Sequence, residues 1–213
     1  RINRADESKS KFIAPKAKKG DKPYRYNWQS PILLSSHNQD ILYLGSNFLH
    51  RSMNQGDTWT AISPDLTQGG KQGNVAFGTL TTISESPFEF GVLYTGSDDG
   101  LVQFSNNGGA NWKVISTTLP QNLWVSRVVA SAHKKERVYV TLNGYRNDDF
   151  TSYVYVSEDA GQTWKSIANN LPASPVNVII EDSVLDSVLY VGTDNGLYIS
   201  VDGGASWQDF SNG

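Results

Sequence analysis

The stretch "SEDAGQTW" at Ser157–Trp164 places an acid, a glycine, a hydroxyl and a tryptophan at fixed offsets. Three near-copies occur elsewhere in the 213-residue chain: "SMNQGDTW" at Ser52–Trp59, "SNNGGANW" at Ser105–Trp112 and "SVDGGASW" at Ser200–Trp207. The four tryptophans are spaced by 53, 52 and 43 residues. A motif that returns at such intervals indicates a repeat architecture in which each copy belongs to one structural unit.

The similarity continues on both sides of the octapeptide. Upstream, the chain repeats "ILYLGSNFLHRS", "VLYTGSDDGLVQFS" and "VLYVGTDNGLYIS", and "RVYVTLNGYRNDDFTSYVYVS" is the same unit with a longer insert. Each unit has the pattern of four short strands, A to D, with turns between them. A β-sandwich would not repeat one sequence at one turn. We therefore predict an all-β fold, a β-propeller with four visible four-stranded blades at about residues 27–66, 75–119, 124–171 and 174–213.

The octapeptide predicts a turn between strands C and D. An Asp or Asn at its third position can accept hydrogen bonds from backbone N–H groups, glycine at its fifth suits a positive φ, and the tryptophan adds apolar area between blades. Asn replaces Asp in two copies, and no Glu follows at the EF-hand position, so a structural turn is favoured over a calcium site. The structural residues predicted are Ser52, Asn54, Gly56, Trp59, Ser105, Asn107, Gly109, Trp112, Ser157, Asp159, Gly161, Trp164, Ser200, Asp202, Gly204 and Trp207.

Composition and charge exclude several functions. The chain has no cysteine, which excludes disulfides, cysteine–zinc sites and thiol catalysis. Residues 1–26 carry nine Lys/Arg and three Asp/Glu, whereas the remainder is acidic. We interpret residues 1–26 as a basic linker or tail. We expect no nucleic-acid partner, because the rest of the chain is acidic and offers no basic face that would extend this segment. No run of 18 apolar residues is present, so we expect no membrane span in this segment.

The repeated octapeptide resembles the Asp-box, or BNR repeat, found in sialidases, xyloglucan-type glycosidases, sortilin-type receptors and a photosystem assembly factor. The longer segments "PYRYNWQSPILLSSHNQDILYLGSNFLHRSMNQGDTWTAISPDLT" and "EDSVLDSVLYVGTDNGLYISVDGGASW" look most similar to large bacterial sortilin-like, BNR-repeat proteins labelled glycosyl hydrolases. The resemblance covers about residues 23–213 and implies a secreted or periplasmic protein. It also implies a six-, seven- or ten-bladed ring, so we expect four blades to be an arc of a longer chain, closed by missing blades or a partner chain.

Candidate ligand residues lie away from the octapeptides. Antiparallel blades place the B–C and D–A loops on the face opposite the C–D turns, and the longest B–C insert is "NGYRNDDF" at Asn143–Phe150. It groups Tyr145 and Arg146 with two acids, and Trp124 and Arg127 belong to the same blade. Aromatic rings with oriented charges suit a sugar or peptide ligand. A solvated, self-paired loop explains the same residues and is favoured.

Candidate catalytic residues are carboxylates on the same face. A glycosidase uses two carboxyl groups that flank the bond, and Asp98, Asp99, Asp148 and Asp149 are the candidates. "SDDG" (Ser97–Gly100) recurs as "TDNG" (Thr193–Gly196), which favours a turn role for Asp98 and Asp99. The arginine cluster of a sialidase cannot be assembled by motif, and no phosphate loop or nucleophile elbow is present.

No metal or cofactor is predicted, because none of the histidines has metal-ligand spacing: His37, His50 and His133. Two functions remain. One is a non-catalytic module that binds a protein, peptide or glycan on the B–C/D–A face, and this is favoured. The other is part of a glycoside hydrolase whose paired carboxylates are divided between these blades and missing ones. A third role, in assembly, would use the open strand edges of the arc to pair with another chain.

Overall fold

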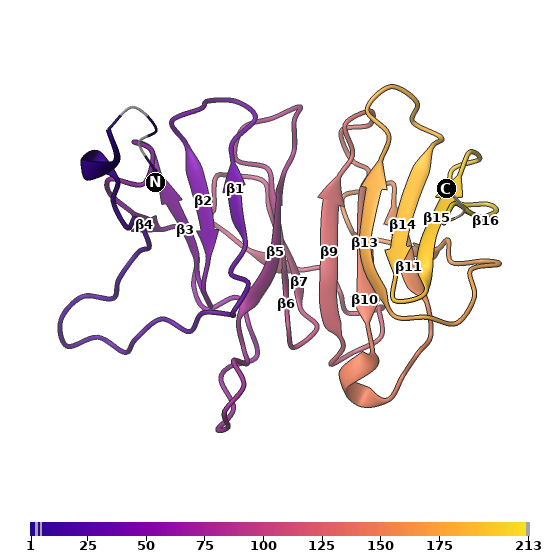
Figure 1. Ribbon diagram of the computed structural model, residues 1–213, viewed down its shortest axis with the longest axis horizontal. Coiled ribbons are helices and arrows are strands. Elements are labelled where there is room, and N and C mark those ends of the chain that lie inside the picture. The colour runs from indigo at the N-terminus through magenta and orange to yellow at the C-terminus, as the bar shows by residue number, and fades with distance from the viewer. Residues whose placement is uncertain (3, 5, 212–213) are drawn as a thin grey trace.

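The computed structural model describes residues 1, 2, 4 and 6–211, so the last two residues of the fourth predicted blade lie outside it. Among the described residues, sixteen strands form four antiparallel sheets, each of four consecutive strands. The predicted all-β fold of four propeller blades is confirmed. Figure 1 shows the sheets side by side in chain order, with the N-terminal end at blade 1 and the C-terminal end at blade 4.

Strand A is the longest strand of blades 2 to 4, and strand D has two residues in every blade. The four blades are, in order, β1 Ile32–Leu34, β2 Leu42–Gly45, β3 Leu49–Ser52 and β4 Thr60–Ala61; β5 Leu80–Glu85, β6 Leu93–Ser97, β7 Val102–Ser105 and β8 Lys113–Val114; β9 Trp124–Ala130, β10 Val138–Asn143, β11 Tyr153–Ser157 and β12 Lys165–Ser166; and β13 Val176–Glu181, β14 Leu189–Thr193, β15 Gly196–Ser200 and β16 Gln208–Asp209. Two 3-10 helices, η1 Glu7–Lys9 and η2 Tyr145–Asn147, complete the described elements.

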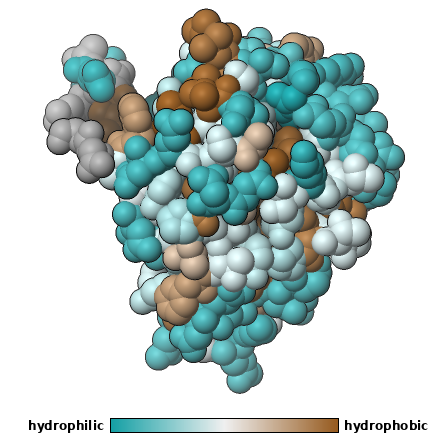
Figure 2. All heavy atoms as spheres, turned by 90° about the vertical axis from the view of Figure 1, so that its right-hand side faces the viewer, coloured by the Kyte–Doolittle hydropathy of each residue, from teal (hydrophilic) through white to brown (hydrophobic). Residues whose placement is uncertain are grey.

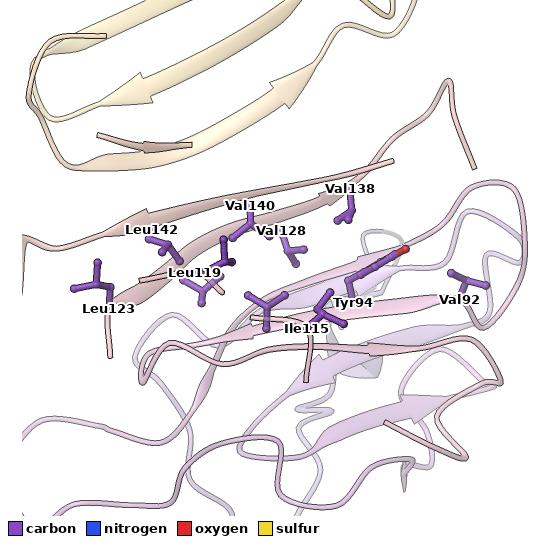
Figure 3. Close-up of a cluster of buried hydrophobic side chains, with 11 residues drawn as sticks. Val92, Tyr94, Ile115, Leu119, Leu123, Val128, Val138, Val140 and Leu142 are labelled. Carbon is purple, nitrogen blue, oxygen red and sulfur yellow. The ribbon is translucent and has the colours of Figure 1, made fainter. Parts of the chain in front are cut away.

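The hydrophobic core lies between blades. Three clusters of buried side chains fill the junctions of blades 1 and 2, 2 and 3, and 3 and 4. Figure 3 shows the middle cluster, where Tyr94 and Ile115 of blade 2 face Val128 and Val140 of blade 3. Because the sheets of blades 2 and 3 bury both faces against neighbouring blades, their strands are apolar without strict alternation. The arc therefore depends on face-to-face packing of successive blades.

Two of the three junctions also contain a buried polar cluster, which we call the Ser–Tyr–Glu cluster. Between blades 1 and 2, Glu85 accepts hydrogen bonds from Ser35 Oγ (2.6 Å) and Tyr43 OH (2.8 Å). Between blades 3 and 4, Glu181 accepts them from Ser131 Oγ (2.8 Å) and Tyr139 OH (3.0 Å), the equivalent residues of those blades. The two clusters lie two blades apart. The middle junction has Ala130 at the position of the glutamate.

The octapeptides form nearly identical turns. In each, the serine oxygen accepts the glycine N–H at 2.8–3.0 Å, and the Asp or Asn Oδ1 accepts the N–H four positions later at 2.8–2.9 Å. The fifth-position glycines all have φ near +90°. Hydrogen bonds from the turn lower the pKa of Asp159 and of Asp202 to about 2, mainly through the hydroxyls of Thr163 and Ser206.

The N-terminal segment contacts blade 1. The Trp59 indole N–H donates to the carbonyl of Ile13, and the ring of Tyr24 packs on His50, with ring centroids 4.6 Å apart. The Tyr26 hydroxyl donates to the carbonyl of Pro15 at 2.7 Å. This segment therefore covers the side of blade 1 that faces away from blade 2. Residues 3 and 5 of the linker or tail interpreted at 1–26 lie outside the described residues.

Candidate binding site

A pocket of about 570 Å³ lies where the inner strands of blades 2 to 4 begin, on the face that carries the B–C and D–A loops. Blade 3 contributes most of its walls, and the helix η2, the coil below β9 and β10 in Figure 1, forms one side. The lining residues are Gln29, Thr81, Trp124, Ser126, Arg127, Asn143, Tyr145, Arg146, Asn177 and Asp194. The pocket thus brings together all four residues proposed from the sequence as ligand contacts.

The insert between β10 and β11 is tightly folded. Gly144 accepts backbone hydrogen bonds from Asn147 and Asp149, and Asn143 Oδ1 accepts the N–H of Tyr145 at 2.9 Å. A Cβ on Gly144 would lie 2.6 Å from the carbonyl oxygen of Asp149, so only glycine fits this turn. Asp148 ends η2 in the left-handed conformation. These local bonds fix where Tyr145 and Arg146 project.

Trp124 and Arg146 form a stacked pair at one side of the pocket. The guanidinium carbon of Arg146 lies 4.2 Å from the centroid of the Trp124 ring. Trp124 begins β9 and Arg146 lies in η2, so the contact joins the D–A loop side of the blade to its B–C insert. A cation–π contact of this length is favourable and keeps the guanidinium N–H groups free for other acceptors.

Arg127 projects from the inner strand of the same blade. The register of β10 on β9 shifts between Thr141 and Leu142, which leaves Ser126 as the extra residue of a β-bulge. Such a bulge redirects neighbouring side chains. Ser126 Oγ donates to the carbonyl of Val176 at 2.7 Å, whereas the Arg127 side chain is exposed and forms no hydrogen bond or ion pair with a described residue. A guanidinium is always charged near neutral pH, so Arg127 presents an uncompensated cation to this pocket.

In the same pocket, a chain of hydrogen-bonded polar side chains crosses from blade 3 to blade 4. Asn143 Nδ2 donates to Asn177 Oδ1 at 2.9 Å, and Asn177 Nδ2 donates to Asp194 Oδ1 at 2.7 Å. Asp194 is the one carboxylate among the described lining residues. Sequence reasoning did not single out Asn177, because its position at the start of a strand carries no signal without knowledge of the neighbouring blade.

Asp98 and Asp99 lie apart from the pocket and are buried. Asp98 accepts hydrogen bonds from the Thr79 N–H (2.9 Å) and hydroxyl (2.7 Å). Asp99 accepts from Ser97 Oγ (2.5 Å) and the Gln68 N–H (2.7 Å), and burial raises the pKa of its carboxyl group. Both side chains thereby hold the loop between blades 1 and 2 against the turn of blade 2.

Asp148 and Asp149 lie in the insert beside the pocket but are not among its lining residues. Asp149 accepts the Thr151 N–H at 3.0 Å and the Tyr153 hydroxyl at 2.8 Å, and the first of these bonds contributes most to lowering its pKa. Asp148 is exposed at the end of η2. None of the four carboxylates proposed from the sequence as catalytic residues is among the residues that line this pocket.

The histidines have structural contacts. His37 and His133 each bond through Nε2 to a carbonyl of the following blade, at 2.8 and 2.7 Å. His50 is buried on β3, where burial lowers its pKa to about 4. Across the part of the chain that the structure describes, no group of three acidic or histidine side chains could hold a metal ion. Nor does any helix in that part have the length and apolarity to cross a membrane.

The same fold occurs in longer chains of known structure. A GH74 xyloglucanase from Xanthomonas campestris aligns with a TM-score of 0.66 and 17% identity over 89% of this chain and 31% of its own. YCF48 from Cyanidioschyzon merolae aligns at 0.55 and 16% over 89% and 56%. The extracellular domain of a one-component system from B. thetaiotaomicron aligns at 0.56 and 18% over 88% and 25%.

These likenesses show the β-propeller fold alone, because the sequence identities are low. The chain spans between a quarter and somewhat more than half of the length of these proteins. No protein-family model and no curated protein matches the sequence.

Proposed function

We propose that this chain is a non-catalytic β-propeller module that binds a protein, peptide or glycan ligand in the pocket of blades 2 to 4. The observation that carries the proposal is the exposed Arg127 guanidinium, which has no carboxylate partner in a pocket that also presents the Trp124–Arg146 stack. Arginine and aromatic side chains in one concavity are the usual contributors to binding energy. An acceptor-rich ligand, such as a peptide carboxylate or an acidic sugar, complements them best.

The alternative is a share in a glycoside hydrolase site. Such a site needs an acid and a base or nucleophile on both sides of one bond. Here Asp194 is the one carboxylate among the described lining residues, and it already accepts a hydrogen bond from Asn177. The pocket therefore favours binding over hydrolysis. We further propose a secreted or periplasmic location, in line with the resemblance to bacterial BNR-repeat proteins and with an extracellular domain among the proteins of similar fold.

The proposal predicts that binding depends on blade 3. The chain would be screened on arrays of neutral and acidic oligosaccharides and of peptides with free or amidated C-termini, and hits titrated by calorimetry. For a ligand found in this screen, Arg127→Ala and Trp124→Ala should each raise the dissociation constant by about 10- to 100-fold. Lys165→Ala, which removes an exposed cation from β12 of the same blade, is the matched control and should leave it unchanged.

Hydrolysis would overturn the proposal. Xyloglucan and acidic oligosaccharides incubated with the chain would be assayed for released reducing ends. Turnover that is lost in Asp194→Asn, Asp99→Asn or Asp149→Asn would assign the chain to the glycosidase alternative. Binding that is equally strong in Arg127→Ala and in Lys165→Ala would place the ligand elsewhere on the surface.

A further inference from the structure

The three junctions inside the chain use one repeated contact. An isoleucine that follows strand D of one blade packs on the octapeptide of the next blade, where its carbonyl accepts the tryptophan indole N–H at 2.7–3.1 Å. A Cβ on the fifth-position glycine would lie 3.0 Å or less from that isoleucine in every case. The isoleucines are Ile62, Ile115 and Ile167. Each junction is thus a side chain seated against a glycine and capped by an indole.

Phe210 occupies the same position in blade 4. It lies three residues after Trp207, as Ile115 lies three after Trp112, and its N–H bonds to the carbonyl of Leu197 as that of Ile115 bonds to Val102. Ile115 is 4% exposed, whereas Phe210 is 56% exposed. Among the described residues, no indole N–H donates to the Phe210 carbonyl. Phe210 therefore has the position of a junction residue, but no octapeptide among the described residues packs on it.

Other apolar side chains of blade 4 are exposed as well. Leu197 is 38% exposed, although Val102 at the equivalent position in blade 2 is fully buried. Ile180 on the inner strand is 56% exposed, and the ring of Tyr190 packs on Phe210 with centroids 6.4 Å apart. Figure 2 looks onto this side of the molecule, where hydrophobic residues lie between polar ones across the surface. The face of blade 4 that points away from blade 3 thus has apolar residues at the positions that blade 2 buries against blade 3.

From this register we infer that the outward face of blade 4 is the docking surface of a further four-stranded blade with its own octapeptide. Its glycine would receive Phe210 and its tryptophan would donate to the Phe210 carbonyl. A second copy of this chain does not fit, because the octapeptide of its blade 1 already holds Ile13, which a docked Phe210 would have to displace.

The polar residues specify which kind of blade fits. Where blades 1 and 3 have Ser35 and Ser131, which bind a glutamate of the next blade, blade 4 has Asp182. A glutamate facing Asp182 would place like charges together at a desolvated junction. Blade 2 has Ser86 at this position and faces Ala130 of blade 3. The partner of blade 4 therefore resembles blade 3, which has an alanine in place of the glutamate.

The test extends the full chain after Gly213 with a second copy of residues 119–171, which is blade 3 with its own connection. Docking should slow amide hydrogen exchange in β15 and β16 by about tenfold or more and reduce binding of a hydrophobic dye. Phe210→Asp in the extended chain should return both to the values of the original chain. An extension with residues 66–119, which presents Glu85 to Asp182, should protect β15 and β16 much less.

Two results would overturn the inference. One is unchanged exchange in β15 and β16 when the added blade is itself folded, as judged by protection of its own inner strands. The other is concentration-dependent self-association of the original chain, abolished by Phe210→Asp in sedimentation, because that would make a second copy the occupant. Ligand binding in the pocket is a separate readout, so failure here does not bear on the proposed binding function.

Discussion

At the scale of single residues, the fifth-position glycines of the octapeptides are required both by a positive φ and by the close approach of an isoleucine. Gly203 and Gly204 are adjacent, and both have positive φ, at +71° and +88°. A Cβ on Gly203 would meet no atom within 4 Å, whereas a Cβ on Gly204 would lie 2.9 Å from Ile167. Only the second glycine is therefore needed for the junction between blades as well as for the turn.

The pair predicts unequal costs for one chemical change. Gly203→Ala should lower the free energy of unfolding by about 1–2 kcal/mol, the cost of the left-handed backbone. Gly204→Ala should lower it by about 2–4 kcal/mol, because the methyl group also pushes on Ile167. Urea unfolding followed by tryptophan fluorescence measures both. Equal losses in the two variants would show that the contact with Ile167 adds nothing.

At the scale of strands and junctions, three equivalent tyrosines differ in whether their hydroxyl bonds to a glutamate of the Ser–Tyr–Glu cluster. Tyr43 and Tyr139 donate to a buried glutamate, whereas Tyr94 in blade 2 is equally buried and bonds to no described residue through its hydroxyl. The three rings lie at the same position of strand B. Their hydroxyls can therefore be compared with little change in packing.

Removing one hydroxyl at a time should show this difference. Tyr43→Phe should destabilise the fold by about 1–3 kcal/mol, since Glu85 loses a donor in a buried place. Tyr94→Phe should change the unfolding free energy by no more than about 0.5 kcal/mol. Denaturant titration of the two variants and the parent gives the comparison. A loss at Tyr94 as large as that at Tyr43 would contradict a stabilising role for the cluster.

The elements were predictable from the sequence to a greater extent than the site. Repetition placed all four blades, because the same turn chemistry returns in each. Trp124 and Arg146 were proposed together, but their stacking depends on the fold of the insert around Gly144. Asn177 and Asp194 reach the pocket from blade 4, and contacts between blades leave no local pattern in a sequence. Likewise, nothing local distinguishes the buried Asp99 from a solvated turn carboxylate.

At the scale of the whole molecule, the two ends of the arc differ. Blade 4 exposes Phe210, whereas the octapeptide of blade 1 is already filled by Ile13 from the N-terminal segment. Ile13 stands in the same relation to Gly56 and Trp59 as Ile62 does to the octapeptide of blade 2. Ile13 of the basic segment thereby makes with blade 1 the contact that an isoleucine after strand D makes at the other junctions.

A pair of neighbouring residues tests this role. Ile13→Ala should lower the unfolding free energy by about 1–2 kcal/mol, because part of a half-buried side chain is lost from the contact with Gly56. Phe12→Ala removes a larger side chain that is 84% exposed and should cost no more than about 0.5 kcal/mol. Urea unfolding measures both, and hydrogen exchange should locate the Ile13 effect in blade 1. Similar values for the two variants would mean that the segment contributes no packing.

The two Ser–Tyr–Glu clusters lie at the first and third junctions of the arc. Blade 2 has a serine and a tyrosine at the same positions, Ser86 and Tyr94, but these face Ala130 of blade 3 instead of a glutamate. The residue at the end of strand A therefore decides whether a junction contains a buried carboxylate that is bonded from the preceding blade.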